Sequence, residues 1–131
     1  MIIDINENGL TELVRDIRSS VDLFVPDHLL TYPVDFSSKV FTKIFRQEKP
    51  FSIIANFAAH KHVRSEKDIF SIEAMVDNNV IKAFKLLKMI SNDTPEHFFC
   101  VSTDKAANPV NIMGASKKLM EDVIMAFSDK I

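Results

Sequence analysis

The turn that decides the fold reads Ser102-Thr103-Asp104-Lys105-Ala106-Ala107-Asn108-Pro109. The apolar run Phe98–Val101 before it predicts a short buried strand. Pro109 disfavours helix at the residue that precedes it, and a helical pattern begins only at Ile112. The charged pair Asp104-Lys105 is therefore expected at the carboxyl end of a strand, where open α/β sheets bind their ligands. Its position alone makes this turn a candidate site.

The rest of the chain alternates predicted strands with predicted amphipathic helices. Strands are expected near Met1–Ile3, Leu29–Val34, Phe51–Asn56 and Phe98–Val101, and the longest helix is expected from Phe70 to Ile90. The apolar residues expected on buried faces are Leu10, Leu13, Val14 and Ile17, then Val40, Phe41, Ile44 and Phe45, then Ile53, Ile54 and Phe57, then Ile72, Val76, Val80, Ala83, Leu87 and Ile90, and last Ile112, Ala115, Leu119, Val123, Ile124 and Phe127. This alternation predicts one α/β domain over residues 1–131, with parallel strands joined by helical crossovers.

Composition excludes several classes of protein. The chain has 131 residues, 47% hydrophobic and 26% charged, which is ordinary for a globular domain with a sizeable core. A formal net charge of −2 gives no electrostatic case for binding nucleic acid or an anionic membrane. The single cysteine, Cys100, excludes an internal disulfide. We expect a cytoplasmic protein, since no apolar run is long enough to span a bilayer and no signal peptide opens the sequence.

Glycine is unusually scarce. Gly9 and Gly114 are the only two glycines, so the chain cannot contain G-x-G-x-x-G. In a Rossmann fold that glycine-rich loop cradles the phosphates of a dinucleotide.

The segment S-T-D-K-A followed by N-P and M-G-A-S-K resembles the active-site segment of the CapD-like polysaccharide biosynthesis proteins. These are extended short-chain dehydrogenase/reductases that act on UDP-sugars. The resemblance continues upstream through Asn56-Phe57-Ala58-Ala59-His60-Lys61-His62-Val63 to Asp4, and covers nearly the whole chain but only the middle of the family's domain. It implies a partial Rossmann fold, truncated at both ends, that lacks the first strand and the glycine-rich loop. It also implies NAD or NADP as cofactor and either 4,6-dehydration or 4-epimerisation of a UDP-N-acetylhexosamine.

The resemblance assigns catalytic roles around the turn. Thr103 falls at the position of the hydroxyl that orients the substrate oxygen. Met113 stands where most members have the tyrosine base, and Lys117 is the lysine four residues on, which is also expected to contact the cofactor. A thioether cannot accept the substrate's proton, so Asp104 and Lys105 are the candidate acid and base, tuned by burial and by each other's charge. The alternative is that they form only a loop ion pair.

The resemblance also assigns binding residues. Asp4 is expected to bond the adenosine ribose, or else to be an acid favoured by the dipole of the helix that follows. Asp35 and Phe36 are expected at the adenine, although Asp35 could simply cap the next helix. Ala58 and Ala59 are expected to let the cofactor approach closely. For the substrate, we expect contacts from Lys61 and His62; His60 and His62 have no partner at ligand spacing, so no metal site is expected.

Two expectations concern the chain as a whole. Without the glycine-rich loop it should bind NAD or NADP poorly, because the pyrophosphate normally sits on that loop. Without the first strand it should expose apolar strand edges, which recruit partners, so a homo-oligomer is expected. The alternative from another class is a non-catalytic remnant that folds or associates without cofactor.

Overall fold

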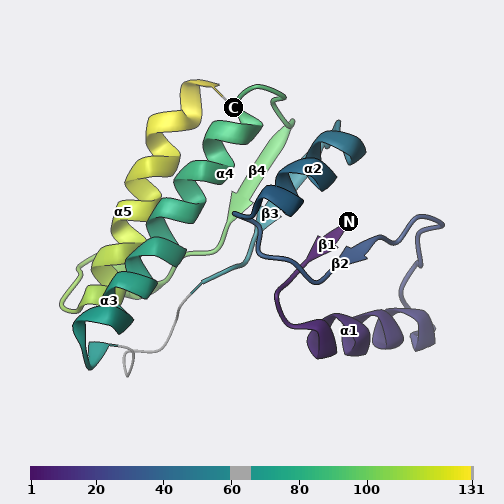
Figure 1. Ribbon diagram of the computed structural model, residues 1–131, viewed down its shortest axis with the longest axis horizontal. Helices are drawn as coiled ribbons and strands as arrows, with labels where there is room; N and C mark the ends of the chain where they lie inside the picture. The colour runs from purple at the N-terminus through teal and green to yellow at the C-terminus, as the bar shows by residue number, and fades with distance from the viewer. Residues whose placement is uncertain (60–65, 131) are drawn as a thin grey trace. The chain divides into compact units, whose positions relative to one another are not determined.

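The computed structural model describes residues 1–59 and 66–130. The chain divides into two compact units, Met1–Gln47 and Glu48–Ile131. Each unit is an α/β arrangement with one pair of parallel strands (Figure 1). The predicted α/β class with parallel strands is confirmed, and the expectation of a single domain over the whole chain stays a prediction.

In the first unit, β1 (Ile2–Ile3) pairs in parallel with β2 (Thr31–Tyr32). Between them lies α1 (Glu7–Ser19), whose first turn is capped by Asn6, since the Asn6 side chain accepts a hydrogen bond from the Gly9 N–H. The buried residue of α1 is Leu10. Leu13, expected on the same face, is 41% exposed, so that part of the expected stripe is wrong.

After β2 the chain forms α2 (Lys39–Glu48). Phe41 and Phe45 are buried on it with ring centroids 5.9 Å apart, as expected from their spacing of four residues. Val40 is 53% exposed, so its expected burial is wrong. Consecutive residues on a helix point about 100° apart, so Val40 and Phe41 do not share one face fully.

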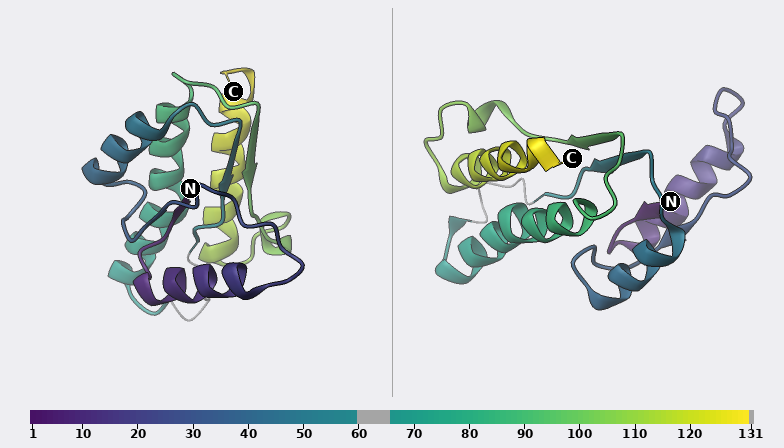
Figure 2. Two further views of the ribbon diagram at one scale, coloured as in Figure 1. Left: turned by 90° about the vertical axis from the view of Figure 1, so that its right-hand side faces the viewer. Right: turned by 90° about the horizontal axis from the view of Figure 1, so that it is seen from above.

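In the second unit, β3 (Ile53–Asn56) pairs in parallel with β4 (His97–Cys100), in a register that sets Ile54 opposite Phe98. One continuous helical stretch joins them, made of α3 (Ile69–Val76), a π-helical turn η2 (Asp77–Ile81) and α4 (Lys82–Ile90). After β4 come the 3₁₀ turn η3 (Asp104–Ala106), helix α5 (Ile112–Phe127) and the short turn η4 (Ser128–Lys130). Figures 1 and 2 show α5 running beside α4.

The core of the second unit lies where these helices meet. Its buried apolar residues are Met75, Ala83, Leu86, Leu87, Ile90, Ala106, Met113 and Met120. The predicted long helix begins at Ile69, because Asp68 caps it by accepting hydrogen bonds from the Ser71 N–H and hydroxyl at 2.9 and 2.7 Å. Both bonds lower the pKa of the Asp68 carboxyl, and the bond from the Ser71 hydroxyl has the larger effect.

Two predicted buried faces differ from the structure. In β3 the inward residue is Asn56, whereas Ile53 is 66% exposed and Phe57, just beyond the strand, is 69% exposed. A pleated strand buries alternate residues, and the described helices of the second unit cover only one face of the pair. On the uncovered face Phe57 lies against Phe99 with ring centroids 5.7 Å apart.

The buried face of α5 is also displaced from the expected apolar stripe. Leu119 is 52% exposed, while Ser116 and Lys117 are buried at 2% and 4% exposure. Polar side chains can occupy this face because each finds a hydrogen-bond partner inside the unit.

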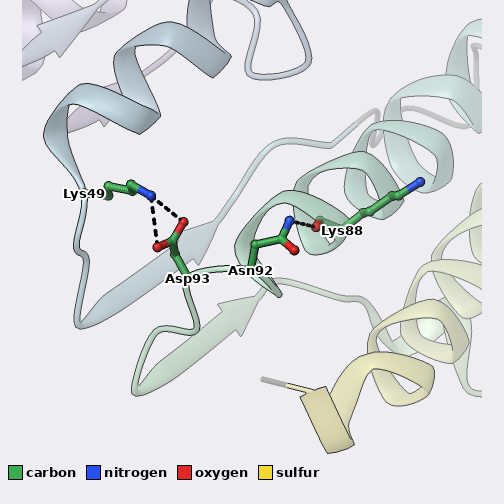
Figure 3. Close-up of polar contacts among 4 residues, drawn as sticks. All are labelled: Lys49, Lys88, Asn92 and Asp93. Atoms are coloured by element: carbon green, nitrogen blue, oxygen red, sulfur yellow. Dashed lines mark hydrogen bonds and ion pairs between the residues drawn. The ribbon is translucent and has the colours of Figure 1, made fainter.

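The amino ends of β3 and β4 are tied together by an ion pair (Figure 3). Lys49 Nζ, four residues before β3, lies 2.8 and 3.1 Å from the two carboxylate oxygens of Asp93. Asp93 follows Asn92, whose side-chain amide donates to the Lys88 carbonyl and so caps the end of α4 (Figure 3). This contact is at the end of the strand pair opposite to the candidate site.

Candidate active site at the end of β4

The chain leaves β4 through Ser102 and enters the 3₁₀ turn η3. Thr103 caps this turn: its hydroxyl accepts from the Lys105 N–H at 3.4 Å and donates to Asp104 Oδ1 at 2.9 Å. Ala106 is fully buried, so the turn is anchored from its third residue. The two charged residues before it remain at the surface.

Asp104 and Lys105 form a loose, exposed pair. Their nearest charged atoms are 3.8 Å apart, and their side chains are 90% and 48% exposed, respectively. The hydrogen bond from Thr103, followed by the charge of Lys105, lowers the pKa of the Asp104 carboxyl. The prediction that burial tunes this pair is therefore wrong, since both side chains are exposed. An ionised Asp104 can accept a proton or stabilise positive charge.

Gly114 lets this turn pack directly onto α5. A Cβ atom built on Gly114 would lie 2.5 Å from the Lys105 carbonyl oxygen, closer than such atoms approach. Only glycine fits without movement of one backbone or the other. The backbone of Lys105 is thereby held against the first turn of α5.

Met113 and Lys117 both lie on the buried side of α5, one turn apart. Met113 is 4% exposed. The Lys117 ammonium donates to the Val101 carbonyl at 3.0 Å, which places it just beyond the end of β4. Burial lowers the pKa of Lys117. Thr103, Asp104, Lys105, Met113 and Lys117 thus gather around one strand end.

Three further polar residues support this site and were not among its predicted members. Asn79, in the π turn η2, donates to the Ser116 hydroxyl at 2.9 Å, and Ser116 donates to the Met113 carbonyl at 2.8 Å. Glu66 Oε1 accepts from the Met113 N–H at 2.7 Å. Separations of 37 and 47 residues link these partners, so no local pattern could have paired them.

The predicted adenosine-binding acids lie in the first unit and make local bonds there. Asp4 is exposed, and its Oδ1 accepts from the Asn6 N–H at 2.8 Å. Asp35 Oδ1 accepts from both the N–H and the hydroxyl of Ser37, at 2.7 and 2.8 Å. The Asp4 bond is consistent with its local alternative, an acid just before a helix. Asp35 does not cap α2, because the side chain that accepts from the Phe41 N–H in the first turn of α2 is that of Ser38. Neither set of bonds excludes a ligand role, because a carboxylate has several acceptor sites.

The other predicted binding residues follow β3 or β2. Phe36 is half-buried after β2. Ala58 is exposed after β3, and its N–H donates to the buried Asn56 side chain at 3.1 Å, while Ala59 is half-buried. Lys61 and His62 lie outside the described residues. Over residues 1–59 and 66–130, no three His, Cys, Asp or Glu side chains gather where they could hold a metal ion.

The fold is similar to that of two solved nucleotide-sugar epimerases. A UDP-glucuronic acid 4-epimerase from Bacillus cereus, solved with NAD, superimposes on 98% of this chain and 43% of its own with a TM-score of 0.72 and 13% identity. A UDP-glucose 4-epimerase from Thermotoga maritima, solved with UDP-glucose, gives a TM-score of 0.69 at 16% identity over 98% of this chain and 52% of its own. At these identities the likeness establishes the fold, a partial Rossmann fold.

The family follows from sequence. Residues 1–131 match the polysaccharide biosynthesis protein family, and the chain belongs to it. The probable polysaccharide biosynthesis protein EpsC of Bacillus subtilis is 29% identical over 119 residues, which cover 91% of this chain and 19% of EpsC. The capsular polysaccharide biosynthesis protein CapD of Staphylococcus aureus is 30% identical over 87 residues, 66% of this chain and 14% of CapD. The resemblance found in the turn sequence is confirmed.

A third relative is the uncharacterized membrane protein MJ1061 of Methanocaldococcus jannaschii, 33% identical over 121 residues, 92% of this chain and 33% of that protein. The chain therefore spans between about a seventh and a third of the length of these curated relatives. Within the part of this chain that the structure describes, no helix has the length and apolarity needed to cross a membrane.

Proposed function

We propose that this chain carries part of the active centre of an NAD- or NADP-dependent enzyme that modifies a nucleotide sugar, by 4,6-dehydration of a UDP-N-acetylhexosamine. One observation carries the proposal furthest: Gly114 holds the Asp104-Lys105 turn against the helix that bears Lys117, at the carboxyl end of β4. That end is where α/β sheets bind ligands. Family membership supports the same reaction class.

The proposed cofactor residues are those that membership of the family implies. Asp4 would bond the ribose, Asp35 and Phe36 would lie at the adenine, and the small side chains of Ala58 and Ala59 would allow close approach. When bound, the nicotinamide supplies a hydride acceptor for the sugar carbon C4 and a donor for a later step. The chain has no glycine-rich loop for the pyrophosphate, so weak binding is expected.

The proton transfers would fall to this chain's own residues. Thr103 would turn its hydroxyl from Asp104 to the substrate oxygen. Once C4 has been oxidised to a ketone and the C4 hydroxyl proton has passed to solvent, Asp104, which its lowered pKa keeps ionised, would accept the proton of C5. The Lys105 ammonium would donate a proton to the departing C6 hydroxyl, so that one water leaves, and would regain a proton from solvent. Met113 has no proton to exchange, and Lys61 and His62 are proposed to contact the substrate.

Mass spectrometry can test this directly. This chain alone is expected to be inactive because its cofactor binding should be weak, so a longer homologue that carries the same turn is incubated beside it with UDP-N-acetylglucosamine and NAD⁺ or NADP⁺. A product from the homologue that is lighter by one water supports dehydration. A product of unchanged mass but altered chromatographic mobility would instead support 4-epimerisation. If the longer homologue also forms no product and calorimetry detects neither UDP-sugar nor NAD(H) binding to it, the non-catalytic alternative is supported. Light scattering at micromolar concentration tests the proposed homo-oligomer.

A further inference from the structure

The backbone of Met113 is held from both sides. Its N–H donates to Glu66 Oε1 at 2.7 Å, and its carbonyl accepts from the Ser116 hydroxyl at 2.8 Å. The Ser116 hydroxyl is in turn fixed by Asn79 at 2.9 Å. Glu66 and Asn79 both lie outside α5, so the first turn of this helix is positioned from elsewhere in the second unit.

The Glu66 contact is a helix cap supplied from a distance. The first amides of a helix have no partner within the helix and need acceptors. The Asn111 side chain accepts from the Gly114 N–H at 2.7 Å, and Glu66 takes the Met113 N–H next to it. A carboxylate is also the favoured charge at a helix N-terminus. Glu66 is half-buried, which strengthens the bond relative to one in water.

This first turn also determines where the Asp104-Lys105 pair lies. Because the Gly114 backbone sits against the Lys105 carbonyl oxygen, displacement of the first turn displaces η3 with it. One turn further along α5, the Lys117 ammonium donates to the Val101 carbonyl. Both proposed catalytic lysines, Lys105 and Lys117, are therefore positioned by the same helix.

We propose that Glu66 is a positioning residue for this site: through the Met113 amide it holds the start of α5 and therefore the η3 turn that carries Asp104 and Lys105. The Asn79–Ser116 bond is the second fixed point, on the carbonyl side of Met113. The catalytic meaning of this inference rests on the proposed function, whereas the positioning itself does not.

Amide NMR on the 131-residue chain tests it without turnover. In Glu66→Ala, hydrogen exchange at the Met113 amide should accelerate by about tenfold or more, since a hydrogen bond to a charged group is lost. The amide resonances of Lys105 and Gly114 should move with it. Glu66→Gln keeps an oxygen acceptor and should restore both readouts. Glu73→Ala, which changes an exposed acid on α3, is the matched control and should change neither.

Two results would overturn the inference: an unchanged Met113 amide in Glu66→Ala, or failure of Glu66→Gln to restore it. If Glu66→Ala does not fold, Glu66→Asp replaces it, because a side chain shorter by one methylene shortens the reach to the amide while keeping the charge. These readouts remain decisive even if the chain proves inactive, so failure of the proposed function and failure of the positioning role are distinguishable.

Discussion

Two lysines at the end of β4 have opposite surroundings. The Lys105 side chain is 48% exposed beside a 90% exposed Asp104, whereas Lys117 is buried at 4% and bonded to a backbone carbonyl. The exposed side chains of Asp104 and Lys105 can move to meet a ligand, but few contacts hold these two side chains in place. The buried side of α5 has the opposite properties. The difference teaches that chemistry and rigidity are divided between two adjacent segments, which the close approach at Gly114 joins.

The largest expected effect separates chemistry from stability. In a preparation that shows turnover, Asp104→Asn or Lys105→Ala should lower kcat by about 100-fold or more, the contribution typical of acid–base catalysis. Met113→Leu should be far milder, because the thioether exchanges no proton. Urea unfolding should show Asp104→Asn to be as stable as the original chain, because Asp104 is exposed. Equal losses of kcat from Met113→Leu and Lys105→Ala would contradict the assignment of proton transfer to Lys105 and not to Met113.

Breaking the junction itself should cost stability. Gly114→Ala forces a Cβ to within 2.5 Å of the Lys105 carbonyl oxygen, so we expect the free energy of unfolding to fall by about 1–3 kcal/mol. Gly9→Ala is the matched control on α1, where the nearest atom is the movable Asn6 side chain at 3.0 Å. Its cost should be smaller than that of Gly114→Ala, because a slight shift of the Asn6 side chain that caps α1 costs less than moving a backbone, and alanine is the better helix former. A stable Gly114→Ala would mean that the turn is not held by this contact.

The buried lysine can be examined through pH. Burial lowers the pKa of Lys117 in the folded chain below the 10.5 of an unperturbed lysine. The folded chain therefore releases this proton before the unfolded chain does. As the pH rises through the folded pKa toward 10.5, the original chain should gain stability relative to Lys117→Met, by about 1.4 kcal/mol per unit of lowering. Urea unfolding of both proteins from pH 7 upward measures this, and parallel curves would show an unperturbed lysine.

The smallest effect is expected far from the site. Lys49 and Asp93 form a close ion pair, but their side chains are 38% and 39% exposed. A double-mutant cycle with Lys49→Ala and Asp93→Ala should give a coupling of about 0.2–1 kcal/mol, reduced by added salt. A coupling above this range would mean that the amino ends of β3 and β4 are held as tightly as the candidate site at their carboxyl ends.

Much of the fold could be predicted from local pattern. The four strands appear where apolar runs were found, although β1 and β2 are only two residues long. The turn between β4 and α5 was also predicted, because Pro109 disfavours a helix at the residue before it. The cap of α5 was not predicted: the Asn111 side chain accepts from the Gly114 N–H. The long helix was expected as a plain α-helix, and its π turn was not foreseen.

What the sequence could not show depends on distant partners. Apolar periodicity favoured Leu119 for the buried face of α5, yet Lys117 is buried because the Val101 carbonyl, 16 residues away, accepts from it. The same holds for Glu66 and Met113. In β3 the sequence does not alternate between apolar and polar residues, because Ile53 and Phe57 are apolar although they lie on the face that the helices of the second unit leave uncovered. The sequence therefore could not show which face is buried. Hydrophobicity identifies what can be buried, and only packing decides which face is.

The π turn at Asp77–Ile81 has a consequence for how this sequence can change length. A π turn accommodates one more residue than the α-helical turn it replaces, so deleting a single residue there would leave an unbroken α-helix. Every residue on one side of the deletion would then rotate by about 100° relative to the other. Asn79 could no longer face Ser116 while the apolar residues of α4 kept their places. Insertions and deletions in this helix are thus constrained by a polar contact, even though the helix itself would tolerate them.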